Sequence, residues 1–304
     1  MRYIVTGAAG FIGSHLSEAL LAEGHEVRAI DSFSDFYDPT LKEANTAAFP
    51  VERLDVADEP LDARGFDGIF HLAGQGGARG FGDSLSAYLR LNVLAAHRVF
   101  EAAASAGVRV VFASSSSVYG DAEAYPTPES TVTAPLSPYG VSKLAAEHIG
   151  HAYARAFGLD LVVLRYFSVF GPRQRPDMAF ARVALALTLH RVFDLYGSGR
   201  QTRGWTYVSD VVAATVAAMA GGSGIYNVGG AVEVSLREVI EHFERLAGRP
   251  LQVRERPAAV GEQPRSNADT SRIRAELGWS PQVELADGIE AQWGWASELA
   301  GRGA

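Results

Sequence analysis

The chain has 304 residues, a hydrophobic fraction of 47% and a formal net charge of −8. This composition predicts a folded globular protein with a sizeable core, and the negative charge argues against nucleic acid as a partner, because phosphate backbones select basic surfaces. The chain lacks cysteine and any apolar run near the roughly 20 residues that cross a bilayer, so we expect no metal, no membrane partner and a cytoplasmic location.

The first expected elements follow one another as strand, turn and helix. A β-branched and aromatic run at Arg2–Thr6 predicts a strand, and a glycine-rich turn at 7–13 leads into a helix that ends at about Glu23. Val27–Ile30 then predicts a second strand, which ends at Asp31.

The same alternation continues through the first half of the chain. Further strands are expected at Val51–Leu54, Ile69–Leu72, Val108–Ala113 and Leu161–Arg165, between helices that include Ser84–Ala106 and Tyr139–Phe157. Strands that alternate with helices predict an α/β fold with a Rossmann-type, doubly wound parallel sheet.

Beyond Gly171 the alternation lapses. Helices are expected at Phe180–His190, Val208–Ala220, Leu236–Ala247 and Ser271–Leu277, with one short strand near Ile225–Val228. We expect residues 1–170 to form the Rossmann domain, with a returning segment at about 205–228. Residues 171–304 are expected to form mainly a smaller, interleaved C-terminal lobe that binds the substrate.

A glycine motif joins the first strand to the first helix. Gly7, Gly10 and Gly13 allow the backbone to approach a pyrophosphate closely at a helix N-terminus. Asp31 would accept hydrogen bonds from an adenosine ribose and repel a 2′-phosphate. The alternative for Asp31 is a turn or helix-capping aspartate. The motif therefore predicts a dinucleotide site that favours NAD over NADP.

Two later strand ends add residues to this site. Asp55 and Val56 follow the third strand, and Leu72, Ala73 and Gly74 follow the fourth. Ligands of doubly wound sheets bind at the carboxyl edge of the strands. We therefore expect these residues to line the adenine and ribose pocket.

A tyrosine and a lysine, Tyr139 and Lys143, lie four residues apart in an expected helix. The chain has only two lysines, and Lys42 is the other. Residues at this spacing share one face of a helix, and a nearby ammonium favours the phenolate form. The pair thus predicts a general base, Tyr139, that works below the usual tyrosine pKa of about 10. The alternative is an exposed pair without a chemical role.

Several motifs in this order resemble the extended short-chain dehydrogenase/reductase family, and within it the nucleotide-sugar epimerases and dehydratases. They are the glycine motif at 7–13, Asp31, the segment 114–120 (SSSSVYG) and the segment 139–143 (YGVSK). The resemblance implies a catalytic triad of Ser115, Tyr139 and Lys143. It also implies a homodimer that forms through the helices at Ser84–Ala106 and Tyr139–Phe157.

The resemblance also suggests which reaction to expect. Family 4,6-dehydratases carry Asp-Glu directly after the triad serine, and UDP-glucuronate decarboxylases carry Glu at the second of these positions. This chain has Ser116 and Ser117 there. Elimination of water would lack its expected acid and base, whereas an epimerase needs neither.

Two further segments, 31–39 and 171–178, are similar to those of UDP-glucuronate 4-epimerases. The resemblance implies that Arg175 faces the sugar carboxylate with help from Ser116, Ser117 and Ser168, a task that suits a bidentate guanidinium. The alternative is that Arg173 and Arg175 make surface ion pairs. Gln75 and Arg79 are expected near the substrate, Arg203 at the UDP pyrophosphate, and Arg265 as a second candidate there. Gly77 and Arg265 depart from the subfamily pattern.

The complete expected cofactor set is Gly7, Gly10, Phe11, Ile12, Gly13, Asp31, Ser32, Asp55, Val56, Leu72, Ala73, Gly74, Asn92, Tyr139, Lys143 and Tyr166. The expected substrate set is Gln75, Arg79, Ser115, Ser116, Ser117, Ser168, Arg175, Arg203 and Arg265. For Asn92, the polarity of a helix surface explains the residue nearly as well as a cofactor contact.

These observations predict an NAD-dependent enzyme that inverts C4 of a UDP-sugar through a 4-keto intermediate, with UDP-glucuronate converted to UDP-galacturonate. The alternatives are a UDP-glucose/galactose 4-epimerase and a UDP-glucuronate decarboxylase. From another class of protein, an NAD-sensing scaffold on the same fold is a further alternative, although such proteins often lack the tyrosine.

Overall fold

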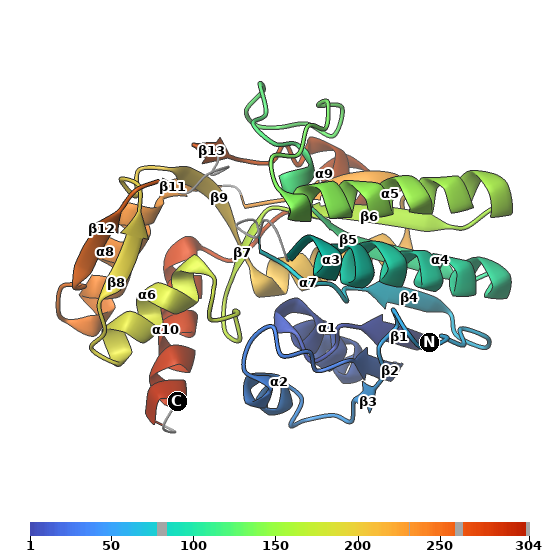
Figure 1. The fold of residues 1–304 in the computed structure, drawn as a ribbon, viewed down its shortest axis with the longest axis horizontal. Coiled ribbons are helices and arrows are strands. Elements are labelled where there is room, and N and C mark those ends of the chain that lie inside the picture. The colour runs from blue at the N-terminus through green and yellow to red at the C-terminus, as the bar shows by residue number, and fades with distance from the viewer. Residues whose placement is uncertain (78–83, 231, 259–263, 302–304) are drawn as a thin grey trace.

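The computed structural model describes residues 1–77, 84–230, 232–258 and 264–301. Within them, a seven-stranded, wholly parallel sheet has the order β10-β6-β5-β4-β1-β2-β3 (Figure 1). Its strands are β1 (Arg2–Thr6), β2 (Glu26–Asp31), β3 (Glu52–Arg53), β4 (Gly68–His71), β5 (Arg109–Ser115), β6 (Leu161–Tyr166) and β10 (Gly224–Val228). The strand order reverses between β1 and β4, as in Rossmann sheets, so the predicted fold class is confirmed.

Helices cover both faces of this sheet because its strands are apolar on both sides. On β5, Val111 and Ala113 pack into one core while Val110 and Phe112 pack into another. The first core includes residues of α1 (Phe11–Ala22) and α7 (Val208–Ala220). The second includes residues of α4 (Ala95–Ala106) and α5 (Pro138–Phe157). Helix α5, which carries Tyr139, thus packs against β5 through this second core.

The expected helix at Ser84–Ala106 is interrupted. It consists of α3 (Ser84–Tyr88), a π-helical segment η1 (Leu89–Leu94) and then α4. A π-helical turn is rare and commonly marks a functional site. Here it contains the buried side chain of Asn92.

A smaller part of the chain packs beside the sheet. A third core joins α6 (Ala179–Thr188), α8 (Leu236–Ala247) and α10 (Leu285–Gly301). Short strands surround this core: β7 (Ser168–Phe170), β8 (Phe193–Tyr196), β9 (Thr202–Tyr207), β11 (Glu233–Ser235), β12 (Val253–Arg256) and β13 (Arg265–Ser266). The remaining elements are α2 (Pro39–Asn45), η2 (Ser116–Val118) and α9 (Ser271–Leu277).

Several boundaries differ from the prediction. The helix expected to end at His190 ends at Thr188, and the strand expected at Val51–Leu54 keeps only two paired residues, Glu52 and Arg53. Most short strands of the smaller part and helix α10 were not predicted. Three glycines, at positions 288, 294 and 301, interrupt the helical pattern of α10. The division near residue 170 stays a prediction. The expected returning segment contains α7 and β10, and both pack with the main sheet.

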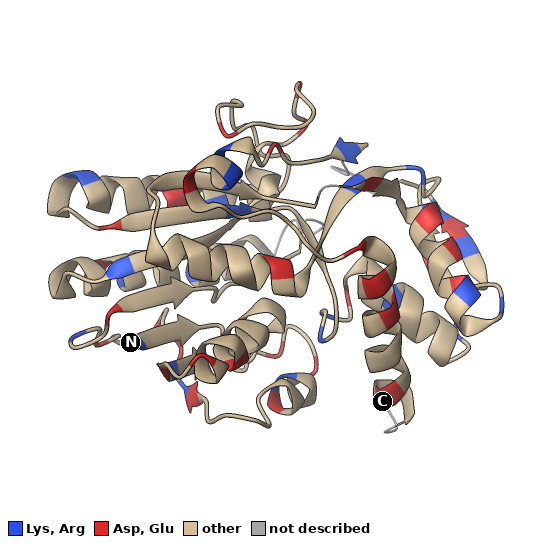
Figure 2. Cartoon of the chain, turned by 180° about the vertical axis from the view of Figure 1, so that it is seen from behind, with Lys and Arg blue, Asp and Glu red and all other residues tan. Residues whose placement is uncertain are grey.

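Charged residues of both signs are interspersed over both parts of the chain (Figure 2). Among the described helices, none combines the length and the apolar character that crossing a bilayer requires. The described residues also form no group of three or more His, Asp or Glu side chains suited to holding a metal ion.

Candidate active site

A cleft of about 720 Å³ opens at the carboxyl edge of the parallel sheet and extends to the smaller part of the chain. Most of the predicted site residues line it: Gly7, Gly10, Phe11, Ile12, Gly13, Asp31, Ser32, Asp55, Val56, Leu72, Ala73, Gly74, Gln75, Ser115, Ser116, Ser117, Tyr139, Lys143, Tyr166, Ser168 and Arg175. The fold therefore brings both the expected cofactor side and the expected substrate side to one cavity.

The glycine motif forms a close-packed turn at the N-terminus of α1. A Cβ atom on Gly13 would lie 2.1 Å from the carbonyl oxygen of Gly7, and one on Gly7 would lie 2.7 Å from the backbone nitrogen of Ala73. Gly7 also has φ +74°, a conformation that favours glycine. The turn thus leaves room for a pyrophosphate beside the free N–H groups of the helix end. The residues present fit a dinucleotide.

Asp31 closes the turn from the end of β2. Its Oδ2 accepts a hydrogen bond from the backbone N–H of Ala9 at 3.0 Å, and its Oδ1 accepts one from Phe33 at 2.8 Å. The side chain is therefore both a loop-capping group and a lining group of the cleft. Each carboxylate oxygen can accept more than one hydrogen bond, so ribose hydroxyls fit the remaining capacity.

Ser115, Tyr139 and Lys143 all line the cleft. Ser115 ends β5, and the other two lie on the first turns of α5. The side chain of Ser137 accepts a hydrogen bond from Gly140 N–H at 3.1 Å, which caps this helix. Lys143 is only 4% exposed, and its Nζ donates to the carbonyl oxygen of Ala113 at 2.9 Å.

Burial shifts both ionisable groups toward their neutral forms. It raises the pKa of Tyr139, more than a hydrogen bond with Ser115 and the charge of Arg175 lower it. Burial also lowers the pKa of Lys143 to about 8, although the charge of Glu147 raises it. In the free protein the groups that lower the pKa of Tyr139 are Ser115 and Arg175, and the expected lowering by Lys143 stays a prediction.

Arg175 enters the cleft from the segment that follows β7. Its Nε and Nη2 each donate to one oxygen of Asp177, at 3.0 Å and 3.0 Å. The guanidinium lies near the Phe36 ring, 5.7 Å from its centroid. Arg173 instead pairs with Glu18 at 2.8 Å. The surface ion pair considered as an alternative is thus present for both arginines, but Arg175 also lines the cleft.

A second hollow of about 160 Å³ adjoins the cleft. Arg203 lines it together with Arg182, and both hollows share Asp177, Ala179 and Trp205. The guanidinium groups of Arg182 and Arg203 are of the kind that binds phosphate, and Asp177 and Asp194 line the same hollow.

Known proteins with similar sequences and folds agree with this geometry. A sequence model of the NAD dependent epimerase/dehydratase family matches residues 3–229. The chain belongs to this family. A UDP-glucose 4-epimerase of Mycolicibacterium smegmatis is 40% identical and covers 95% of this chain and 96% of its own length. A UDP-glucuronate 4-epimerase of Thermodesulfobacterium geofontis is 31% identical, with coverages of 97% and 96%.

A solved structure gives the same fold. UDP-glucuronic acid 4-epimerase from Bacillus cereus, in complex with UDP-glucuronic acid and NAD, has a TM-score of 0.94 and 35% identity, covering 98% of this chain and 100% of that one. As a member of this NAD-dependent family, the chain uses NAD as its cofactor, which agrees with the glycine turn and Asp31.

Within this epimerase/dehydratase fold, three predicted site residues do not line the cleft: Asn92, Arg203 and Arg265. The Oδ1 of Asn92 accepts from Gln75 N–H at 2.7 Å, and its Nδ2 donates to Gln75 O at 3.0 Å and to Ser142 Oγ at 2.9 Å. Asn92 therefore positions the backbone of Gln75. Arg203 lines the adjoining hollow instead of the cleft.

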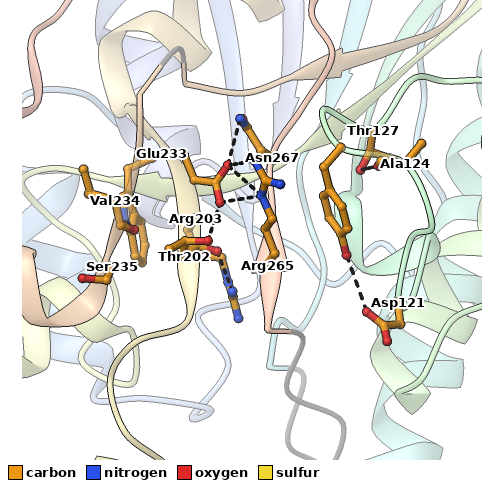
Figure 3. A network of polar contacts seen from close by, with 12 residues as sticks. Asp121, Ala124, Thr127, Thr202, Arg203, Glu233, Val234, Ser235, Arg265 and Asn267 are labelled. Atoms are coloured by element: carbon orange, nitrogen blue, oxygen red, sulfur yellow. Dashed lines mark hydrogen bonds and ion pairs between the residues drawn. The ribbon is translucent and has the colours of Figure 1, made fainter.

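Arg265 lines neither hollow. Its Nε and Nη2 donate to Glu233 at 2.7 and 2.8 Å, and Glu233 also accepts from Asn267 (Figure 3). The guanidinium lies over the Tyr125 ring, 5.1 Å from its centroid. Arg265 is thus engaged by Glu233 in the free protein, and its contact with the pyrophosphate stays a prediction. The predicted residue Arg79 lies outside the described residues.

The sequence analysis missed several residues that line the cleft, among them Asp177, Tyr88 and Trp205. Tyr88 donates a hydrogen bond to Gly77 O and lies 6.0 Å from the Tyr139 ring, centroid to centroid. Asp177 had a local signal, since it lies two positions after Arg175. The other two are aromatic residues of the kind that usually fill cores, so no feature of the sequence distinguishes them from core residues.

Proposed function

We propose that this protein is an NAD-dependent UDP-sugar 4-epimerase that converts UDP-glucuronate to UDP-galacturonate. The observation that carries the proposal is the guanidinium of Arg175, which lines the cleft with Ser116, Ser117 and Ser168. No carboxylic acid follows Ser115 directly in the chain, so the groups beside the triad suit a carboxylate ligand and not elimination of water. By the family resemblance we also propose a homodimer, and from the lack of cysteine a cytoplasmic location.

In this proposal each residue of the cleft has a defined task. The glycine turn holds the pyrophosphate of NAD, Asp31 the adenosine ribose and Lys143 the nicotinamide ribose. Bound NAD supplies the hydride acceptor at C4 and returns the same hydride, so the net redox change is zero. Tyr139 takes the proton of the C4 hydroxyl and later gives it back. Ser115 hydrogen-bonds that hydroxyl and the phenol.

The proposed intermediate also explains the need for Arg175. A 4-keto uronate is a β-keto acid, and it loses CO₂ readily when the bond to its carboxylate stands perpendicular to the carbonyl plane. A bidentate hold on the carboxylate restrains that rotation. Arg175 and the adjoining serines would thus protect the acid group while the 4-keto sugar turns to present its other face.

A second candidate is a UDP-glucose/galactose 4-epimerase. The ion pair between Arg175 and Asp177 favours it, because a neutral sugar leaves this pair undisturbed. A relative with that function is 40% identical. A UDP-glucuronate decarboxylase is less well supported, because Ser117 replaces its glutamate. The NAD-sensing scaffold is disfavoured because Ser115, Tyr139 and Lys143 all line one cleft.

Substitution of Arg175 separates the first two candidates. We expect Arg175→Ala to lower the association constant for UDP-glucuronate roughly 10- to 100-fold, the loss typical of a charge-assisted hydrogen bond, as measured by titration calorimetry in a Tyr139→Phe background. The value for UDP-glucose should change less than about threefold. Arg173→Ala, two residues away and paired with Glu18, is the matched control. Equal losses on both sugars would refute the assigned role of Arg175.

A further inference from the structure

The guanidinium of Arg175 already holds a carboxylate. Asp177 receives one hydrogen bond from Nε and one from Nη2, the two-pronged geometry in which arginine binds carboxylates generally. Asp177 lies at the junction of the cleft and the adjoining hollow, since it lines both. In the free protein, an acidic side chain of the chain itself thus stands where a substrate carboxylate would be recognised.

Arg175 has supports that do not depend on Asp177. A Cβ on Gly76 would lie 2.6 Å from Arg175 Nη1, so the guanidinium packs directly against the backbone of that residue. The ring of Phe36 also lies near the guanidinium, 5.7 Å from the guanidinium carbon to the ring centroid. The arginine therefore stays in the cleft when its ion pair opens.

Asp177 is the more solvent-exposed partner. Its side chain is 43% exposed, compared with 24% for Arg175. A carboxylate with this exposure regains water when it turns away, and ion pairs at such sites contribute little to stability. The pair can consequently exchange one carboxylate for another at low cost.

We propose that Asp177 is an internal competitor that occupies the carboxylate site of Arg175 and that an anionic sugar must displace. The inference rests on the proposed function, because it requires a substrate that carries a carboxylate. A neutral sugar leaves the pair intact. Asp177 therefore lowers the affinity for uronates selectively and keeps the arginine neutralised while the cleft is empty.

The test measures sugar-nucleotide binding to the NAD-loaded protein by titration calorimetry, with Tyr139→Phe in every variant so that turnover does not obscure the affinity. We expect Asp177→Asn to tighten UDP-glucuronate binding about fivefold, the equivalent of one semi-exposed ion pair. UDP-glucose binding should stay within about twofold. Asp177→Ala should likewise tighten UDP-glucuronate binding and leave UDP-glucose binding within about twofold.

The matched control is Asp62→Asn. Asp62 makes the same two-pronged contact with Arg64, also two residues away, at 2.9 and 2.8 Å, but outside the cleft. The Asp62→Asn substitution removes the same charge from the protein and should change neither the affinity for UDP-glucuronate nor that for UDP-glucose. Tighter binding of both sugars in Asp177→Asn, or weaker binding of UDP-glucuronate, would overturn the inference.

The same titrations separate this inference from the proposed function. If Arg175→Ala weakens UDP-glucuronate binding selectively while Asp177→Asn has no effect, the proposed function stands and the competitor role fails. If Arg175→Ala weakens both sugars alike, the carboxylate site itself is wrong and both proposals fail.

Discussion

At the scale of single residues, the centre of the cleft holds two ionisable groups that burial pushes toward neutrality. The pKa of Tyr139 is raised and that of Lys143 falls to about 8. Glu147, one further helical turn along α5, favours the charged lysine, and a buried ion pair with Arg165 at 2.7 Å holds this glutamate. The protonation of Lys143 therefore depends on the Glu147–Arg165 ion pair as well as on its burial in the cleft.

A stability prediction follows for Lys143. Between pH 8 and about 10.5 the unfolded chain binds a proton at this lysine that the folded protein does not, so its burial penalty is complete below pH 8 and disappears as the pH rises. We expect Lys143→Met to raise the free energy of unfolding at pH 7 by on the order of 1–3 kcal/mol. The gain should shrink by pH 9.5, while catalysis is lost.

Urea unfolding of the cofactor-free protein at pH 7 and pH 9.5 measures this effect. Tyr139 does not interfere, because its raised pKa lies above this range. A methionine variant that is less stable than the parent by the same amount at both pH values would show that the hydrogen bond to Ala113 outweighs the buried charge.

At the scale of elements, the π-helical segment η1 directs the side chain of Asn92 toward the backbone of Gln75. Its amide makes a reciprocal pair of hydrogen bonds with Gln75 and a third with Ser142 on α5. The loop after β4 is thereby fixed to two helices. Sequence periodicity predicts a helix at this position but does not reveal the extra residue in its turn.

We expect Asn92→Ala to lower the free energy of unfolding by about 2 kcal/mol, because the N–H and C=O groups of Gln75 lose their partners. The affinity for NAD should fall as well, since Gly74 and Gln75 line the cleft. Chemical unfolding and calorimetric titration with NAD measure the two effects. Glu101→Ala, an exposed position on α4, is the control, and a similar loss there would contradict the assigned role.

At the scale of the whole molecule, the C-terminal helix α10 supports the segment that carries Arg175. Gln292 donates to Gln174 Oε1 at 2.9 Å and accepts from Gly171 N–H at 2.8 Å. Gln174 also accepts from Ala181 N–H at the start of α6. Both glutamines are buried, so the substrate side of the cleft depends on a helix more than a hundred residues further along the chain.

The sequence predicts the part of the site that local rules determine. The glycine turn follows from the close approach that Gly7 and Gly13 permit, and the common face of Tyr139 and Lys143 follows from helical spacing. Tertiary contacts decide the rest. Arg265 lies over Tyr125 and pairs with Glu233, which no spacing reveals. The engagement of Lys143 with Ala113 and the role of Asp177 likewise depend on packing between distant segments.

The central claim is that the protein inverts C4 of UDP-glucuronate by removing one hydride and restoring it. Its most direct test uses UDP-glucuronate with deuterium at C4, incubated with NAD and the protein in ordinary water and followed by NMR. The account predicts UDP-galacturonate that keeps the deuterium at C4. A product with solvent hydrogen at C4, release of CO₂ as the main reaction, or conversion of UDP-glucose alone would contradict it.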